Sequence, residues 1–265
     1  MKPPAGFSRA RRDLGGKSAP SPVHSAPTAS SLAETARSAQ EQWFAFLQFV
    51  DGRSHTRWVF RGCGSLTHEC KPSVGRRADY NRLDEVRLFR AFQRSAGLYL
   101  DLSPTNDWEW LALAQHYGLP TRLLDWTTNP LVAAFFAVSS GDQDRDAVVY
   151  AYSVSDEEVI DPVAVPDPFE IGSAVRFLLP SKTVLRIVSQ RGLFSVHPEP
   201  STAWEPEALQ KNRFIVPAGM RARFRRRLFR LGVDDSHIWG DLDGLCRTLK
   251  WRYEGRIGIG STVVG

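Results

Sequence analysis

The amino-acid sequence predicts an α+β fold in which mixed sheets are flanked by helices. Apolar side chains at helical spacing indicate several helices, and short runs rich in β-branched and aromatic residues indicate several strands. These segments do not alternate in the regular strand–helix–strand order of a parallel α/β sheet, and the sequence has no internal repeat. A chain of 265 residues forms one large domain or two small ones and buries a core without disulfides.

Six segments are predicted to be helical from their apolar spacing and end signals. Asn106 and Glu109 have the spacing of a capping box at the start of the predicted helix over residues 106–117. Asn129 and Pro130 are suited to be the N-cap and first residue of the predicted helix that continues over residues 131–138. This helix is apolar enough to lie at the centre of the fold. The six segments are residues 42–52, 83–92, 106–117, 131–138, 181–190 and 220–231.

Four segments are predicted to be strands because they combine β-branched or aromatic residues with bounding turn residues. The first ends in a glycine turn at Gly62, and the third follows Gly192. The four segments are residues 57–62, 147–154, 193–197 and 213–216.

The first 40 residues differ in composition from the rest. Six basic and two acidic side chains give them +4 of the formal net charge of +5, and they are rich in Ser, Ala and Pro. Such a segment buries too little apolar surface to offset its ordering entropy, so we expect a disordered tail over 1–40 and a folded domain over 41–265. Gly15–Ser18 resembles the end of a phosphate-binding loop, but the earlier glycine and the preceding strand are missing.

Cysteine usage and hydropathy exclude other classes of protein. Three cysteines without a C-x-x-C spacing exclude a disulfide framework and favour a reducing compartment. Cys63, His68 and Cys70 lack a fourth ligand at a recognisable interval, so no metal site is expected. The longest apolar run, residues 131–138, is far too short to span a membrane. We therefore expect a soluble, cytoplasmic protein.

Several motifs between about residues 55 and 250 resemble the FRG domain family, which takes its name from a Phe-Arg-Gly motif. The long central motif, QHYGLPTRLLDWT over residues 115–127, is the most specific. The resemblance implies a domain but no agreed activity. The remaining matching segments are Phe60–Gly62, Lys71–Ser73, Asn129–Ala133, Phe136–Ala137, residues 190–194 and Asp241–Leu245.

Arg61 is the most informative candidate residue. An arginine that ends a strand directly before a glycine offers a rigid fork of donors suited to a phosphate or a carboxylate, and Gly62 lets a ligand approach the backbone. An ion pair with Asp125 that holds the fold together is an equal alternative.

The central motif is rich in polar groups for a segment that only packs, which favours a ligand pocket. His116 is suited to acid–base chemistry or ligand contact, and equally to capping the end of its helix, which we favour. Arg122 and Asp125 are expected to position the turn before Trp126. The candidate ligand-binding residues are Gly62, Gln115, His116, Tyr117, Thr121, Arg122 and Asp125.

The order of these elements also resembles, more distantly, the arginine-type ADP-ribosyltransferases. In that superfamily a strand ends in Arg-Gly, a Ser/Thr-rich strand leads into a helix, and an acidic pair precedes a later strand. The corresponding segments here are Arg61–Gly62, residues 126–137 and residues 205–216.

This second resemblance implies that NAD is the substrate and that an unknown macromolecule accepts the ADP-ribose. Arg61 would hold the pyrophosphate, and Thr127 or Thr128 would orient the reacting groups. Glu207 would stabilise the sugar cation formed when the nicotinamide bond breaks. Tyr117 would stack on the nicotinamide ring. The rival acids are Glu205, Asp241 and Asp243.

Two alternatives to an enzyme remain open. The first is a non-catalytic ligand-binding or interaction module, in which Arg61 and Asp125 hold the fold together. The second, which we favour less, is nucleic-acid binding through six arginines between Arg221 and Arg230. Apolar residues fall at helical spacing between them, so we expect these arginines to be the solvated face of an amphipathic helix.

Overall fold

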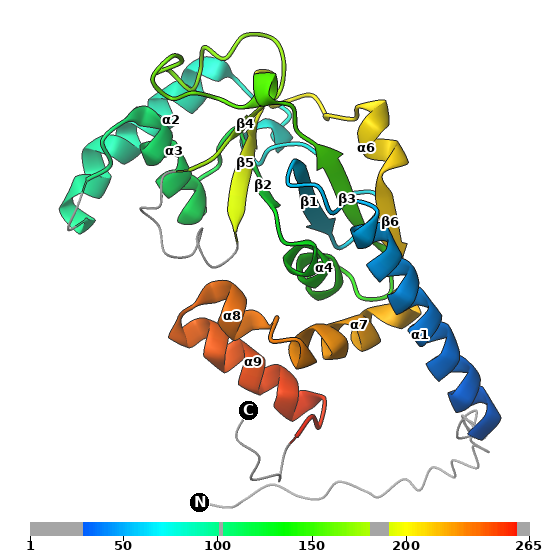
Figure 1. The fold of residues 1–265 in the computed structure, drawn as a ribbon. Helices are drawn as coiled ribbons and strands as arrows, with labels where there is room; N and C mark the ends of the chain where they lie inside the picture. Colours follow the sequence, from blue (N-terminus) through cyan, green and yellow to red (C-terminus); the bar gives the residue numbers. More distant parts are fainter. Residues whose placement is uncertain (1–28, 101–102, 181–190, 259–265) are drawn as a thin grey trace, which may run out of the picture. The chain divides into compact units, whose positions relative to one another are not determined.

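The computed structural model describes residues 29–100, 103–180 and 191–258 (Figure 1). The chain divides into two compact units, residues 1–38 and 39–265. The first unit is described only over residues 29–38, which belong to helix α1, Ala29–Asp51. Most of the predicted tail and the predicted helix at 181–190 therefore lie outside the described residues.

The second unit is built on one six-stranded sheet in the order β4-β5-β2-β1-β3-β6. All neighbouring strands are antiparallel, so the described part of the sheet is not mixed as the sequence analysis expected. The α+β class itself is confirmed. The strands are β1 (Trp58–Cys63), β2 (Leu123–Thr127), β3 (Ala147–Ser153), β4 (Arg176–Leu178), β5 (Gly192–Val196) and β6 (Arg213–Val216).

Eight α-helices lie within the described residues. Asn106 and Asn129 act as N-caps, as predicted, because their side chains accept hydrogen bonds from Glu109 N and Leu131 N, each at 3.0 Å. Glu109 completes its capping interaction on Thr105 N at 2.7 Å rather than on Asn106. After α1, the helices are α2 (Arg82–Ala96), α3 (Asp107–His116), α4 (Pro130–Ser139), α6 (Glu207–Lys211), α7 (Ala218–Arg230), α8 (Asp235–Trp239) and α9 (Leu242–Glu254).

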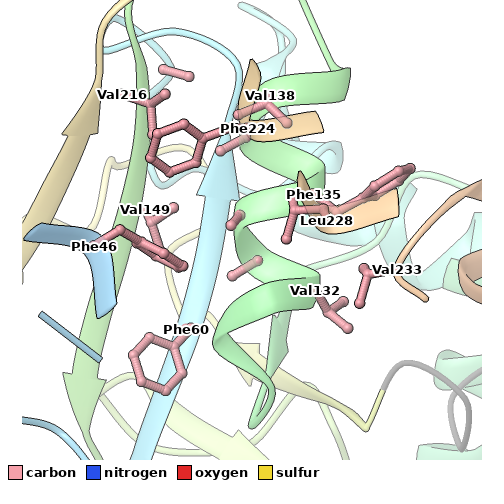
Figure 2. Close-up of a cluster of buried hydrophobic side chains, with 14 of the residues drawn as sticks. Phe46, Phe60, Val132, Phe135, Val138, Val149, Val216, Phe224, Leu228 and Val233 are labelled. Atoms are coloured by element: carbon pink, nitrogen blue, oxygen red, sulfur yellow. The ribbon is translucent and has the colours of Figure 1, made fainter. Parts of the chain in front are cut away.

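Helix α4 is the centre of the largest hydrophobic cluster. It packs against β1 and β3 with buried residues such as Val132 and Phe135, and Phe224 and Leu228 of α7 close its outer side (Figure 2). Phe46 of α1 fills the same cluster. A helix with no polar face is stable only when it is covered on all sides, and the sheet, α1 and α7 provide that cover.

The two faces of the sheet bury different side chains because successive residues of a strand alternate. Phe60 belongs to the α4 cluster, whereas Val59 and Cys63, one and three residues away along β1, belong to a second cluster with Trp126. A third cluster joins α2 and α3 to Leu123, Phe194 and other residues of β2 and β5. Because Asp125 pairs with Phe194 across β2 and β5, its side chain lies on the face of the sheet that α2 and α3 cover.

The main differences from the sequence prediction have physical causes. Helix α1 begins at Ala29 rather than near Gln42. Residues 29–41 contain several alanines and no glycine or proline, so local propensity favours helix although the composition resembles a tail. Strands β2 and β4 and helices α6, α8 and α9 were not predicted. The first four of these elements have only three to five residues, whereas α9 has 13 residues and its apolar spacing was overlooked. Asp125 and Trp126 both lie within β2, so the turn expected before Trp126 is a strand instead.

Arg221 does not lie on a solvated helix face, although the sequence predicted that it would. It is 1% exposed, and its guanidinium donates to five main-chain carbonyls at the end of α4 and in the turns beside it. Carbonyls at the end of a helix lack donors within that helix. Arg221, which belongs to α7, supplies these missing donors.

Candidate functional site

A cavity of about 350 Å³ lies where the sheet meets the ends of three helices. Its floor is formed by β1, β2 and β5, and its walls come from the C-terminal end of α3, from one side of α4 as far as its C-cap Ser140, and from α8. Phe60, Phe136, Phe194 and Trp239 supply apolar lining. Arg61, Gln115, His116, Asp125, Thr127 and Ser140 supply polar groups.

The floor is open because β1 and β2 part from each other beside the cavity. The two strands pair only at Phe60 and Thr127, although β1 pairs with β3 along all six of its residues. Beyond that point Arg61 Nη1 donates to the main-chain oxygen of Asp125 at 2.6 Å. The guanidinium thus replaces a ladder hydrogen bond and holds the diverging strands together.

Arg61 pairs with Tyr150 across β1 and β3, so its side chain starts on the face of the second cluster, opposite the Asp125 side chain. Burial alone lowers the pKa of Arg61, but Cys63, Cys70 and Asp125 raise it, and the net direction is upward. Arg61 Nε is buried without a hydrogen-bond partner within the described structure. The predicted ion pair between Arg61 and Asp125 is therefore a bond to the main chain of Asp125.

The carboxylate of Asp125 is held by Gln115 at the end of α3. Gln115 Nε2 donates to Asp125 Oδ2 at 3.1 Å, and Gln115 Oε1 accepts from the hydroxyl of Thr121 at 2.6 Å. This second bond fixes which end of the amide faces Asp125. Asp125 is nevertheless exposed, so its carboxylate remains open to a ligand in the cavity.

Two close contacts shape the walls. A Cβ on Gly62 would lie 1.8 Å from the main-chain oxygen of Ala133, so only glycine lets α4 approach β1 this closely. Phe136 of α4 and Trp239 of α8 meet edge to face with ring centroids 6.5 Å apart. These rings give one side of the cavity an aromatic wall suited to a flat ligand group.

His116 and Thr127 complete the lining. His116 is the last residue of α3, and its ring meets that of Tyr117 edge to face at 5.0 Å. Thr127 is buried, and its hydroxyl accepts from Asn129 N at 3.0 Å, which fixes the turn from β2 into α4.

The structure brings together six of the ten predicted site residues, and the other four are not among the cavity-lining residues. Tyr117 is 68% exposed, and the hydroxyl of Thr121 is used by Gln115. Arg122 is fully buried and bonds Glu85 through two nitrogens, at 2.9 and 2.7 Å. Glu207 is exposed at the start of α6 and pairs with Lys211. Asp125 is thus the acid that shares a cavity with Arg61 and Thr127.

Sequence reasoning missed Ser140, Phe194 and Trp239 as site residues and took Phe136 for plain core. Phe136 lies on an apolar helix, and Trp239 ends a helix of five residues. Neither position carries a local signal of function, because they reach the cavity only through tertiary packing.

The described residues include no group of three or more His, Cys, Asp or Glu side chains placed to hold a metal ion. Cys63 and Cys70 are buried beside Arg61, and burial raises the pKa of the Cys70 thiol to about 11. Within the same described part, no helix is both long and apolar enough to cross a membrane.

Residues 56–146 match the model of the FRG domain. This segment is an FRG domain. It contains β1, β2, α3 and α4, and so two of the three floor strands and two walls of the cavity, whereas β5 and α8 lie beyond the FRG match. The motifs that resemble the FRG family extend to about residue 250, whereas the match to the family model ends at Asp146. No curated protein and no solved structure gives a match.

Proposed function

We propose that the FRG domain binds NAD at this cavity and breaks its nicotinamide–ribose bond, with Asp125 as the reacting carboxylate. The observation that carries the proposal is the shared cavity of Asp125, Arg61 and Thr127. Asp125 takes the role that the sequence analysis gave to Glu207. The cavity volume lies near the lower end of the range for ligand sites, which is about 300–1,000 Å³, so it fits one half of a dinucleotide.

The reaction needs little from the protein beyond placement and one negative charge. As the C–N bond breaks, its electron pair leaves with nicotinamide and the ribose becomes cationic, which a nearby carboxylate stabilises. Water or a macromolecular hydroxyl then forms the new C–O bond and loses its proton to Asp125 or His116. Phe136 and Trp239 would receive the nicotinamide ring. Arg61 acts as a positioning residue, because it holds the floor strands that present Asp125.

The test is nicotinamide release from NAD by the full chain, measured by chromatography with and without a cell extract as acceptor source. Asp125→Asn keeps the bond from Gln115 but removes the charge, so turnover should fall by about 100-fold or more while NAD binding by calorimetry persists. Glu207→Gln is the matched control and should leave turnover unchanged. Wild-type protein that neither binds nor cleaves NAD would exclude the proposal.

A non-catalytic ligand-binding module is the second candidate, and one observation favours it. Arg61 donates to the main chain of Asp125, and Gln115 already bonds the carboxylate, so both charges also have structural uses. This candidate predicts that the cavity binds NAD, that wild-type protein releases no nicotinamide, and that Asp125→Asn weakens binding instead of turnover.

A further inference from the structure

Helix α9 exposes a row of large apolar side chains along one face. Leu242, Leu245, Leu249 and Tyr253 are between 44% and 74% exposed, and they follow one another at intervals of three or four residues. Side chains at this spacing lie side by side on a helix. We refer to these four residues as the α9 stripe.

The opposite face of α9 packs closely against α8 through small residues. Gly244 and Thr248 are the buried residues of α9, and a Cβ on Gly244 would lie 2.6 Å from the main-chain oxygen of Asp235. Thr248 Oγ1 also accepts from Ser236 N at 3.0 Å. Because α9 uses this narrow face to join α8, the α9 stripe is left directed away from the protein's own core.

The charges of α9 are divided between its two ends. Asp241 and Asp243 lie at its start, whereas Lys250, Arg252 and Arg256 outnumber Glu254 at its end. Asp243 and Lys250 are seven residues apart, about 10 Å along the axis, which is too far for an ion pair within one helix. A partner helix that runs antiparallel, with the same division of charge, would bring each acidic end against a basic end.

We propose that two copies of this chain pair through antiparallel α9 helices, with the α9 stripes in contact. In an antiparallel pair related by a two-fold axis, residues at equal distances from the centre face each other. Leu245 and Leu249 are equally distant from Arg247, and the midpoint of Asp243 and Lys250 lies between Cys246 and Arg247, half a residue away. The two midpoints differ by only about 0.8 Å along the helix axis, so the apolar and the charged contacts fit one antiparallel arrangement, and both are isologous.

The pairing is weak by its size. Helix α9 has 13 residues and is about 20 Å long, so one helix pair buries less than the roughly 1,200 Å² of a stable interface. We therefore expect a reversible dimer with a dissociation constant of roughly 10–100 µM, weakened by salt because charges contribute. The pairing is independent of the proposed NAD chemistry, although Trp239 of α8 links α9 to the cavity wall.

Cys246 provides a built-in probe of the pairing. It is exposed at the predicted centre, whereas Cys63 and Cys70 are buried. A short bismaleimide applied to the full chain at about 50 µM should give a covalent dimer, and Cys246→Ser should abolish it. Sedimentation velocity between about 2 and 200 µM should show the reversible dimer without a cross-linker.

Variants test the contacts and the register. Leu245→Glu with Leu249→Glu should leave a folded monomer at every concentration, and the matched control Leu83→Glu, at an exposed leucine of α2, should still pair. Asp243→Lys and Lys250→Glu should each weaken pairing about tenfold or more, and the double variant should restore it. Thermal unfolding verifies that every variant is folded.

Four results would overturn the proposal. The first is a wild-type chain that stays monomeric up to 200 µM and gives no cross-link. The second is a dimer that the stripe variants leave intact. The third is a charge exchange that fails to restore pairing, since antiparallel register requires it. A monomer that sediments with anionic lipid vesicles through the α9 stripe would assign this face to membranes instead.

Discussion

Arg122 and Glu85 are opposite charges buried in contact with each other between β2 and α2. Their side chains are 1% and 3% exposed, Tyr80 donates a third hydrogen bond to Glu85, and the Phe169 ring lies against the guanidinium. A charge taken out of water is stabilised only while its partner remains. The pair therefore fixes α2 against the start of β2, near the cavity rather than in it.

Removal of one partner should strongly destabilise the protein. We expect Glu85→Gln to lower the free energy of unfolding by about 3 kcal/mol, because the charge of Arg122 is left buried without a counter-charge. Urea denaturation measures the change. Asp84→Asn, which breaks an exposed ion pair with Arg87 on the same helix, is the control and should have little effect. Equal losses in both variants would contradict this account.

At the scale of elements, the contact between β1 and α4 sets the depth of the cavity. The main chain of α4 lies against Gly62, and Phe60 and Val132 pack in the same cluster (Figure 2). Because Gly62 follows Arg61 at the end of a predicted strand and has no side chain, we expected it to let a ligand approach the backbone. The structure shows that the main chain of α4 occupies the space that a Cβ on Gly62 would need.

Gly62→Ala should therefore separate α4 from β1. The added methyl group meets main-chain atoms of Ala133 and Ala137 that cannot move aside, and overpacking of this kind costs about 1–3 kcal/mol or more. Thermal or urea unfolding tests the change. Gly97→Ala, where a Cβ meets no atom of the described residues within 4 Å, should leave stability unchanged or slightly raised. Similar stabilities of the two variants would show that α4 adjusts freely.

At the scale of the whole molecule, a buried histidine couples stability to pH. His197 is 1% exposed, its Nε2 lies 2.9 Å from the hydroxyl of Ser195, and that hydroxyl accepts from Trp126 Nε1 at 2.9 Å. Burial, together with the charges of Arg61 and Arg122, lowers the pKa of His197 to about 3. The folded protein therefore keeps this ring neutral where an unfolded chain would protonate it.

The direction of the pH effect follows from that difference. An unfolded chain takes up the proton near pH 6.5, so it binds more protons than the folded protein as the pH falls from there towards 3. We expect this residue to lower the free energy of unfolding by about 1.2 kcal/mol between pH 6 and 5. Urea denaturation at each pH measures the slope. His197→Gln should flatten it and His68→Gln, at an exposed histidine, should not.

Many elements could be predicted from the sequence because their signals are local. Strand β6 has the predicted bounds of 213–216, and β1, β3, β5, α2, α3, α4 and α7 lie within a few residues of their predicted segments. Asn129 and Pro130 are the N-cap and first residue of α4, as expected. Each of these signals, apolar period, capping residue or turn, acts within one or two turns of chain.

Several features needed the tertiary structure because partners distant in sequence decide them. The sequence around these three arginines does not indicate their different roles. Arg221 donates to main-chain carbonyls, Arg122 pairs with a buried glutamate, and Arg61 joins two strands. Likewise, motif order alone favoured Glu207 over Asp125 as the candidate catalytic acid, whereas the folded sheet places Asp125 in the cavity. Burial sets the role of a charged side chain, and burial is a property of the packed molecule.

The sequence by itself therefore determined the α+β class, most segment boundaries and the FRG resemblance, because propensity and periodicity are written locally. The folded chain decided which polar residues share the cavity, which arginines are structural, and that α9 leaves its leucines exposed. Those outcomes depend on which distant segments exclude water from one another.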